Sequence, residues 1–294
     1  MSALKFLVPG VISQEEFDAV NIEIYDVAPG VLMLVGLGGN IGVSFGEDAT
    51  FMIDGQFGPL TEKIFAAVAT RTDKPVLVVL NTHWHLDHVA ANESLVDRGV
   101  TILAHENVRK RLSVDQVLPA FGQTVPARPQ KALPSVTFTE DMSLHWNGDT
   151  IEIFHAPGAH TDGDTIVHFR KGNVIHMSDT YFNGMYPLID IDCGGSIDGM
   201  IAVAEAVLVR SNESTKIIPG HGPLSNQSEL EAYRDMLVTV RDAVSTLIQE
   251  GKSQEEAIAA KPTAAIDADW IDGVLEPDVF VAHVYTSLTK TTGQ

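Results

Sequence analysis

The sequence predicts an α/β (α+β) fold in which two β-sheets pack face to face and helices cover both outer faces, a four-layer αββα sandwich. Three observations lead to this prediction. The chain contains two β-rich stretches, and each is followed by a helix, a strand and a loop with polar residues. Apolar residues make up 45% of its 294 residues, enough for a large core. Apolar sheet faces are buried against each other and against helices, which gives the layered arrangement.

The first half begins with short runs of strand-forming residues separated by turn residues. These runs cover residues 22–27, 31–35, 41–45 and 50–53. A helix is predicted at 61–71, because Ile64, Phe65 and Val68 recur at helical spacing. The half is completed by a buried strand (76–80), a helix from about 89 to 97, a strand (100–104) and a helix (105–112).

A connection rich in proline, from Pro119 to Pro134, leads to the second half. Strands are predicted there at 135–138, 142–146, 150–154, 165–169 and 173–177. A helix (197–209), a strand (216–218) and a mostly helical remainder (228–290) follow. We expect a single domain over residues 1–294, with its core at about 20–225 and a helical C-terminal extension at 226–294.

The net charge of −20 argues against binding to nucleic acid or to an anionic membrane surface, because both would repel the chain. No apolar stretch is long enough to cross a membrane. Residues 1–10 lack the pattern of a secretory signal, so the chain as written is expected to be cytoplasmic, or periplasmic if a signal peptide has been removed. A small-molecule substrate is the expected partner. The oligomeric state stays open.

The segment from Asn81 to His88 carries the strongest chemical signal. His83, His85, Asp87 and His88 fall within six residues, directly after an apolar strand. Eleven histidines in 294 residues make such a cluster a large excess over chance. Imidazole with carboxylate suits zinc, and iron or manganese less often. The segment therefore predicts a metal site.

Three further candidates each follow a strand-like run: His160, Asp179 and His221. Because strand ends meet at one edge in layered α/β folds, residues distant in sequence can converge there. Five histidines and two aspartates are too many for one zinc ion, which usually takes four ligands. They fit two ions that share a bridging carboxylate, as in two-metal hydrolytic sites.

The order His-x-His-x-Asp-His, then His, Asp and Gly-His, resembles the metallo-β-lactamase superfamily over about residues 20–225. That family has the αββα sandwich fold. The resemblance implies one Zn²⁺ held by His83, His85 and His160, a second held by Asp87, His88 and His221, and a bridge through Asp179. It also implies that Asp54 hydrogen-bonds a ligand-bearing loop from behind.

Two positions depart from the family pattern. Ala159 stands between Gly158 and His160, where the family usually has Gly-His. Asp179 stands where the best-studied β-lactamases have cysteine. Aspartate there is typical of the broader hydrolases, including lactonases and thioesterases. The lone cysteine, Cys193, does not match that position and is interpreted as a buried small residue.

Other residues around the motifs have weaker assignments. The glycine-rich loop 36–42 lies between two strands with no helix after it, so it is interpreted as a mobile hairpin tip rather than a phosphate cradle. In place it matches the flap that β-lactamases close over substrate. Trp84 is expected either to wall the site or to pack in the core. Tyr181 and Asn183 are expected on the substrate side.

These residues predict a dinuclear zinc hydrolase in which a metal-bridging hydroxide attacks the carbonyl of a small cyclic amide or ester. Asp87 is expected to orient the hydroxide and to pass a proton to the leaving group. The alternatives are a lactonase or thioesterase, or an accessory or cyclase-like protein that assists cofactor chemistry. Residues 180–199 contain no Lys or Arg to hold a substrate carboxylate, which leaves lactam hydrolysis open. Iron-dependent relatives usually have Glu in place of His85.

Overall fold

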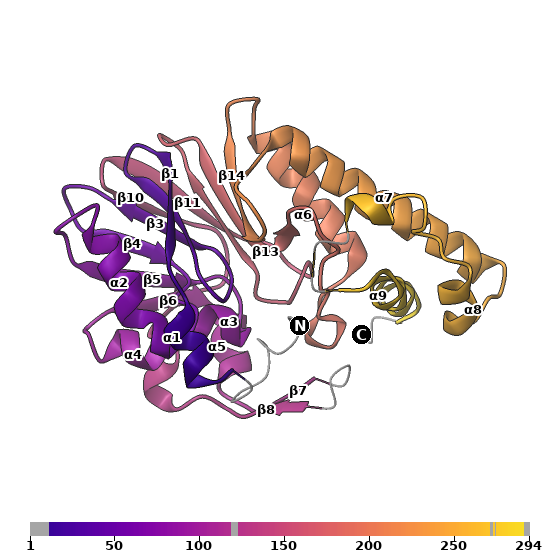
Figure 1. Ribbon diagram of the computed structural model, residues 1–294, viewed down its shortest axis with the longest axis horizontal. Helices are drawn as coiled ribbons and strands as arrows, with labels where there is room; N and C mark the ends of the chain where they lie inside the picture. Colours follow the sequence, from indigo (N-terminus) through magenta and orange to yellow (C-terminus); the bar gives the residue numbers. More distant parts are fainter. Residues whose placement is uncertain (1–11, 119–122, 271–272, 274, 291–294) are drawn as a thin grey trace.

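The computed structural model describes residues 12–118, 123–270, 273 and 275–290. Two sheets lie face to face, and helices cover the outer side of each (Figure 1). The predicted four-layer αββα sandwich is confirmed. Residues 1–10, which the expectation about a signal peptide concerned, lie outside the described residues. Within the described residues, no helix is both long and apolar enough to span a bilayer.

The first sheet has strand order β1-β2-β3-β4-β5-β6-β9. Alternating side chains explain its place inside the sandwich: Val31 and Met33 face the second sheet, whereas Leu32 and Leu34 face the outer helices. Such strands, buried on both faces, are typical of inner layers. The strands are β1 (Glu23–Ala28), β2 (Val31–Val35), β3 (Ile41–Phe45), β4 (Thr50–Ile53), β5 (Val76–Asn81), β6 (Thr101–His105) and β9 (Val136–Phe138).

The outer face of this sheet is covered by α1 (Gln14–Ala19), α2 (Thr61–Ala69) and α4 (Asn92–Val96), while α5 (Glu106–Leu112) follows β6. The helix predicted from about 89 to 97 is confirmed only in its later part, as α4. The chain instead forms α3 (Leu86–Val89) and then α4. The loop after β4 causes the break: the carbonyl of His88 accepts from Gly55, and the amide of Ala91 donates to the carbonyl of Gln56.

The second sheet has strand order β10-β11-β12-β13-β14-β15. The strand at 135–138 was predicted in this half, but as β9 it pairs in parallel with β6 of the first sheet. The predicted strand at 173–177 continues to residue 182, with shifts in its pairing to β14 around Ser178. The strands are β10 (Met142–Trp146), β11 (Asp149–His155), β12 (Thr165–Phe169), β13 (Val174–Phe182), β14 (Lys216–His221) and β15 (Ser225–Asn226).

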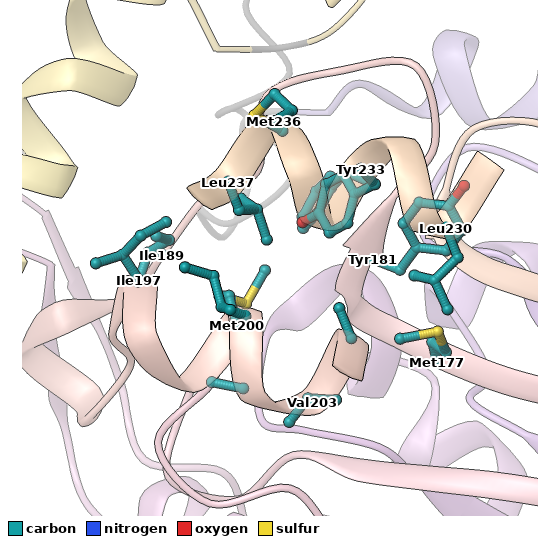
Figure 2. Close-up of a cluster of buried hydrophobic side chains, with 14 of the residues drawn as sticks. Met177, Tyr181, Ile189, Ile197, Met200, Val203, Leu230, Tyr233, Met236 and Leu237 are labelled. Atoms are coloured by element: carbon teal, nitrogen blue, oxygen red, sulfur yellow. The ribbon is translucent and has the colours of Figure 1, made fainter. Parts of the chain in front are cut away.

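Helices α6 (Ile197–Arg210), α7 (Gln227–Gln249) and α9 (Pro277–Thr289) lie on the outer side of the second sheet, with α8 (Gln254–Ala259) beyond them (Figure 1). Apolar residues of β13, α6, α7 and α9 form one buried cluster. Figure 2 shows Tyr233 and Leu237 of α7 in that cluster, with Met200 of α6. The C-terminal helices therefore share a core with the strand that carries Asp179.

A small hairpin, not predicted, lies in the proline-rich connection. It consists of β7 (Gln116–Leu118) and β8 (Gln123–Val125), and the residues between them lie outside the described part of the chain. Val125 and Leu112 of α5 join a buried cluster that also contains Trp84 and Cys193. Cys193 belongs to the short 3₁₀ helix η5 (Ile191–Cys193), and its interpretation as a buried residue is confirmed.

Candidate metal centre

The seven predicted ligands meet at one end of the two sheets. Four follow β5 of the first sheet, and three come from segments of the second sheet. Their ligand atoms form two groups, in each of which all atoms lie within 4.8 Å of one another. The groups are His83, His85, His160 and Asp179, and then Asp87, His88 and His221.

Asp179 lies between the two groups. Its Oδ2 is 3.9 Å from Nε2 of His83 and 3.7 Å from Nε2 of His160. Its Oδ1 is 3.1 Å from Nε2 of His88, and its Oδ2 is 3.4 Å from Nε2 of His221. One carboxylate thus faces imidazoles of both groups, which is the geometry of a bridging ligand.

Several inward atoms of the centre have no hydrogen-bond partner although they are buried. They include Nε2 of His83 and Oδ1 of Asp87, while Nε2 of His88 and Oδ1 of Asp179 face each other, 3.1 Å apart. Buried polar atoms in proteins are nearly always paired. A set of imidazole nitrogens and carboxylate oxygens left free at one point suits zinc ions. The residues present therefore fit the metal ions that the motif implies.

Neighbouring groups fix which ring nitrogen of each histidine points inward. His83 Nδ1 lies 3.1 Å from Thr82 Oγ1, and that hydroxyl donates its own proton to Asp54. The imidazole of His83 must therefore donate from Nδ1, which leaves the Nε2 lone pair free. His88 is oriented in the same way, because its Nδ1 donates to Asp54 Oδ2 at 2.8 Å and its Nε2 therefore points inward.

Asp54 connects both groups from behind. It adopts positive φ (65°) at the end of β4 and accepts hydrogen bonds from the amide (2.8 Å) and hydroxyl (2.7 Å) of Thr82. The same carboxylate receives His88 Nδ1. Asp54 thus hydrogen-bonds the ligand-bearing loop and contacts a residue of each group, His88 directly and His83 through Thr82.

His85 and His160 face each other with their lone pairs. His160 donates from Nδ1 to the carbonyl of Leu188 at 2.8 Å, and His85 donates from Nε2 to Asp190 at 3.0 Å. The remaining nitrogens, His160 Nε2 and His85 Nδ1, are 2.9 Å apart. At this distance one cation, a proton or a metal ion, can be held between the two nitrogens.

The metal-free centre divides its charge unevenly. Burial lowers the pKa of His83 well below its usual value and that of His160 to about 4, so both rings are neutral. Burial acts in the same direction on His221, but the carboxylates of Asp179 and Asp87 outweigh it and raise its pKa to about 9. The pKa of His88 is raised for the same reason. Protons on these two rings balance the aspartates, and a divalent cation would displace them.

The glycine-rich loop between β2 and β3 packs against this centre. The backbone of Gly39 is so close to His88 that a Cβ there would lie 2.1 Å from the ring. Asn40 donates through Nδ2 to the carbonyls of Pro219 and Gly222, on either side of His221. The hairpin was correctly predicted, but the prediction that its tip is mobile was wrong. Hydrogen bonds from Asn40 attach the loop to the end of β14 in the second sheet.

The family model described as the metallo-beta-lactamase superfamily matches residues 34–233. The chain belongs to this superfamily. Among curated relatives, the hydroxyacylglutathione hydrolase of Nitrosococcus oceani is 25% identical over 215 residues, which cover 72% of each chain. The 2,4-dinitroanisole O-demethylase subunit alpha of Nocardioides sp. is 29% identical over 114 residues, 38% of this chain. The match spans only 31% of that subunit.

Solved structures with the same fold include a metallo-beta-lactamase and an alkylsulfatase. A metallo-beta-lactamase from Pontibacter korlensis has a TM-score of 0.60 at 19% identity, covering 74% of this chain and 99% of its own. A sec-alkylsulfatase from Pseudomonas sp. has a TM-score of 0.67 at 15% identity and covers 90% of this chain. This chain spans half the length of the alkylsulfatase. The wider coverage means that part of the C-terminal helical region is also matched.

The departure from the superfamily pattern at Ala159 is accommodated. Its side chain is fully buried in the core cluster of the second sheet, and Gly158 before it takes the positive φ (66°). Asp164 then accepts hydrogen bonds from the amides of His160 (2.7 Å) and Thr161 (2.8 Å). The loop therefore holds the His160 backbone in place with an alanine in the position of the usual glycine.

Two of the expected substrate-side residues support the site from behind. Tyr181 is fully buried beside Tyr233 (Figure 2), and its hydroxyl contacts Ser225, so the expectation that it lines the substrate side was wrong. The amide of Asn183 donates to the carbonyl of His221, and its side chain donates to Pro223, so it holds the His221 loop. Both side chains are occupied in supporting β13 and the loop after β14.

Of the two roles considered for Trp84, the structure shows packing. The indole is 1% exposed, lies in the cluster under α3 and α5, and contacts the ring of His85 edge-on at 4.7 Å. It restricts the imidazole from the side away from the centre.

Sequence reasoning missed Asp190, the Leu188 carbonyl and Asn40. Asp190 and the Leu188 carbonyl contact ligand residues from a loop without a motif, whereas Asn40 holds the residues on either side of His221. A backbone carbonyl leaves no trace in a sequence, and an isolated aspartate resembles any turn residue. The glycines of the first hairpin were a usable signal for Asn40, because close backbone approach is one reason for such glycines.

Proposed function

We propose that the protein is a metal-dependent hydrolase that holds two zinc ions and cleaves a small cyclic ester or amide at its carbonyl. The observation that carries the proposal is the position of Asp179, whose two oxygens face imidazoles of both groups. A carboxylate shared in this way would suit a hydrolytic two-metal site, in which the ions typically lie about 3.5–4 Å apart. Superfamily membership and the hydroxyacylglutathione hydrolase relatives support the hydrolase class.

In this proposal His83, His85 and His160 would hold the first ion, Asp87, His88 and His221 would hold the second, and Asp179 would be shared. When bound, such ions polarise a carbonyl oxygen and lower the pKa of water to near neutrality. Asp87 has a catalytic role in addition to its role as a ligand. Its Oδ2 lies 3.3 Å from His221 Nε2, whereas its Oδ1 has no hydrogen-bond partner. That oxygen would orient the attacking water, accept a proton from this water and pass the proton to the leaving group.

Substrate approaches from the side of His221. Its side chain is 20% exposed, whereas those of the other six proposed ligands are at most 5% exposed. Phe182 stacks on the His221 ring at 5.3 Å and is itself buried, so it supports the ring from the core side.

Among the described residues, no basic side chain is a main influence on the centre. The largest effects on the pKa values of Asp87, Asp179 and His221 come from burial and from His and Asp of the centre itself, and no Lys or Arg is among them. Two cations in nearby segments are already paired, Arg111 with Asp162 and Lys290 with Asp192. Neither of these two described side chains is therefore free to hold a substrate carboxylate, and the positive charge of the centre would come from the metal ions.

A thioesterase is the second candidate. The hydroxyacylglutathione hydrolase relatives favour it, because one of them matches this chain over 72% of its length. The two candidates differ in charge as well as in bond type, since glutathione carries two carboxylates. A neutral thioester separates the effect of the bond from the effect of the charge.

The test combines metal analysis with a substrate panel. Purified protein should contain about two zinc ions per chain. It should hydrolyse neutral lactones or esters faster than cephalosporins, a neutral thioester and glutathione thioesters. Asp179→Asn should lose metal and lower turnover roughly 100-fold or more, because one ligand serves both ions. Asp192→Asn, a surface control, should change neither.

Less than one metal ion per chain, or mostly iron, would contradict the dinuclear zinc proposal. Fastest turnover of a thioester would favour the second candidate. Two zinc ions with no turnover of any substrate would favour an accessory or cyclase-like role.

A further inference from the structure

Asp190 lies beside the metal centre without belonging to the predicted ligands. Its side chain is 8% exposed, and its Oδ2 lies 3.0 Å from Nε2 of His85. A carboxylate of this kind accepts hydrogen bonds and does not donate them. The contact therefore fixes the proton of His85 on Nε2 and leaves the Nδ1 lone pair facing the centre.

His85 is the exception among the imidazoles whose inward nitrogen is fixed. His83, His88 and His160 direct Nε2 inward, because Nδ1 of each hydrogen-bonds a neighbour. His85 directs Nδ1 inward. Trp84 restricts the ring from one side but offers no hydrogen-bond acceptor to choose between its nitrogens. The group that makes this choice is the carboxylate of Asp190.

Asp190 is itself held in place. Its Oδ1 accepts from the amide of Cys193 at 3.1 Å, as the N-cap of η5. Its own amide donates to the carbonyl of His160 at 2.9 Å, and its carbonyl accepts from Gly195 at 2.8 Å. The loop is thereby fastened to a second ligand residue of the same group. A carboxylate held this way orients its partner without further ordering.

The charge of Asp190 acts mainly on one of the two groups. The first group consists of three imidazoles and the shared Asp179, whereas the second has Asp87 as a carboxylate of its own. A carboxylate hydrogen-bonded to a metal-binding histidine increases the basicity of the ring and the affinity for the metal. Asp54 makes this contact with His88 in the second group, and Asp190 makes it with His85 in the first.

We propose that Asp190 is a positioning residue that selects the Nδ1 face of His85 and so sets the zinc affinity of the first group. The proposal rests on the dinuclear centre of the proposed function. It assigns to η5 and the loop before it a role in metal binding that is separate from contact with substrate.

The test compares Asp190→Asn with Asp192→Asn. Asp192 lies in the same short helix but pairs with Lys290 at the surface, so it is a matched control. Zinc binding to metal-free protein is measured in competition with a chelator. Asp190→Asn should weaken one of the two binding steps by about 10- to 100-fold. Asp192→Asn should leave both steps as in the wild type.

Two further measurements connect the effect to His85. In metal-free protein labelled with ¹⁵N-histidine, the hydrogen-bonded Nε2 proton of His85 should be visible by NMR and should be lost in Asp190→Asn. In a double-mutant cycle, Asp190→Asn should add little to the loss caused by His85→Ala, because both act on the same contact. Asp190→Ser keeps an acceptor for the Cys193 amide but cannot reach His85. Asp190→Ser should weaken zinc binding as Asp190→Asn does. It replaces Asp190→Asn in the test if the Asn variant does not fold.

Wild-type zinc affinity in both Asp190 variants would overturn the inference, as would full additivity with His85→Ala. Failure of the wild type to bind two zinc ions is a different result, because it would overturn the proposed function first.

Discussion

Each imidazole of the metal centre has two ring nitrogens, and its neighbours decide which of them faces inward. Thr82, Asp54, Leu188 and Asp190 make this choice for four of the five histidines. The ring orientation is therefore set by hydrogen bonds before any metal arrives, and the cost of ordering the ligands is met during folding.

Gly39 shows how closely the first hairpin is fitted to the centre. An added Cβ would lie 2.1 Å from Cε1 and 2.5 Å from Nε2 of His88. We predict that Gly39→Ala displaces this ring and weakens zinc binding at the second group by roughly 10-fold or more, the size of effect seen when ligand-orienting contacts are lost. Zinc titration of the metal-free variant measures it.

Gly172→Ala is the control for this substitution. A Cβ at Gly172 would make ordinary contact with Val31 at 3.4 Å. The backbone of Gly172 does not have a positive φ, so alanine is not strained there. This variant should bind zinc as the wild type does. Unchanged zinc affinity in Gly39→Ala would show that the hairpin yields and does not constrain His88.

At the residue scale, the sequence was sufficient to predict the ligands that follow a recognisable spacing. His83, His85, Asp87 and His88 were predicted because four ligands in six residues follow a strand, and the structure brings them together with His160, Asp179 and His221. Asp190 could not be predicted, because its contact with His85 depends on how a loop far along the chain returns to the first sheet.

At the scale of elements, strands and helices with clear periodicity were predicted nearly to their ends. β2 and α2 are examples, because alternating and helical patterns are local properties of the sequence. The break between α3 and α4 was not predicted, because it arises from backbone hydrogen bonds to Gly55 and Gln56. The pairing of β9 with β6 was missed for a related reason: a strand run does not reveal its sheet.

The C-terminal helices test the expected domain organisation. We propose that residues 226–294 belong to the same folding unit as the sheets, because Leu237 and Tyr233 of α7 are buried in the cluster formed with β13. Leu237→Ala should lower the free energy of unfolding by about 2–5 kcal/mol. Urea unfolding followed by tryptophan fluorescence and by far-ultraviolet circular dichroism should show one coincident transition, shifted to lower urea.

Thr239→Ala, at an exposed position of the same helix, should change stability by no more than about 0.5 kcal/mol. Two separate transitions in the wild type, with Leu237→Ala affecting one of them, would instead show that the C-terminal region is an independent unit.

At the scale of the whole molecule, the buried histidines predict how the stability of the metal-free protein depends on pH. The pKa of His221 is raised to about 9, so its contribution is present below pH 6.5 and is lost as pH rises towards 9. The pKa values of His160 and His176 are lowered to about 4, chiefly by burial. Unfolding lets these rings bind protons, so stability falls as pH decreases from 6.5 towards 4.

We therefore expect the metal-free protein to be most stable near pH 6.5, with lower melting temperatures on both sides. Saturating zinc should remove the loss on the alkaline side, because the ion takes the place of the protons on His221 and His88. Thermal unfolding from pH 4 to 9, with and without zinc, measures this. A metal-free protein as stable at pH 9 as at 6.5 would contradict the electrostatic account.

The division of the ligands between the two sheets has a consequence for how the metals are acquired. His83, His85 and His88 are neighbours along the chain and can chelate an ion before folding, whereas His160, Asp179 and His221 join them only when the second sheet docks. An ion captured early would be held by an incomplete set of ligands, and its affinity for the unfolded chain would reduce the stability gained on folding. Refolding the chain first and adding zinc afterwards is thus the order of events that the architecture favours.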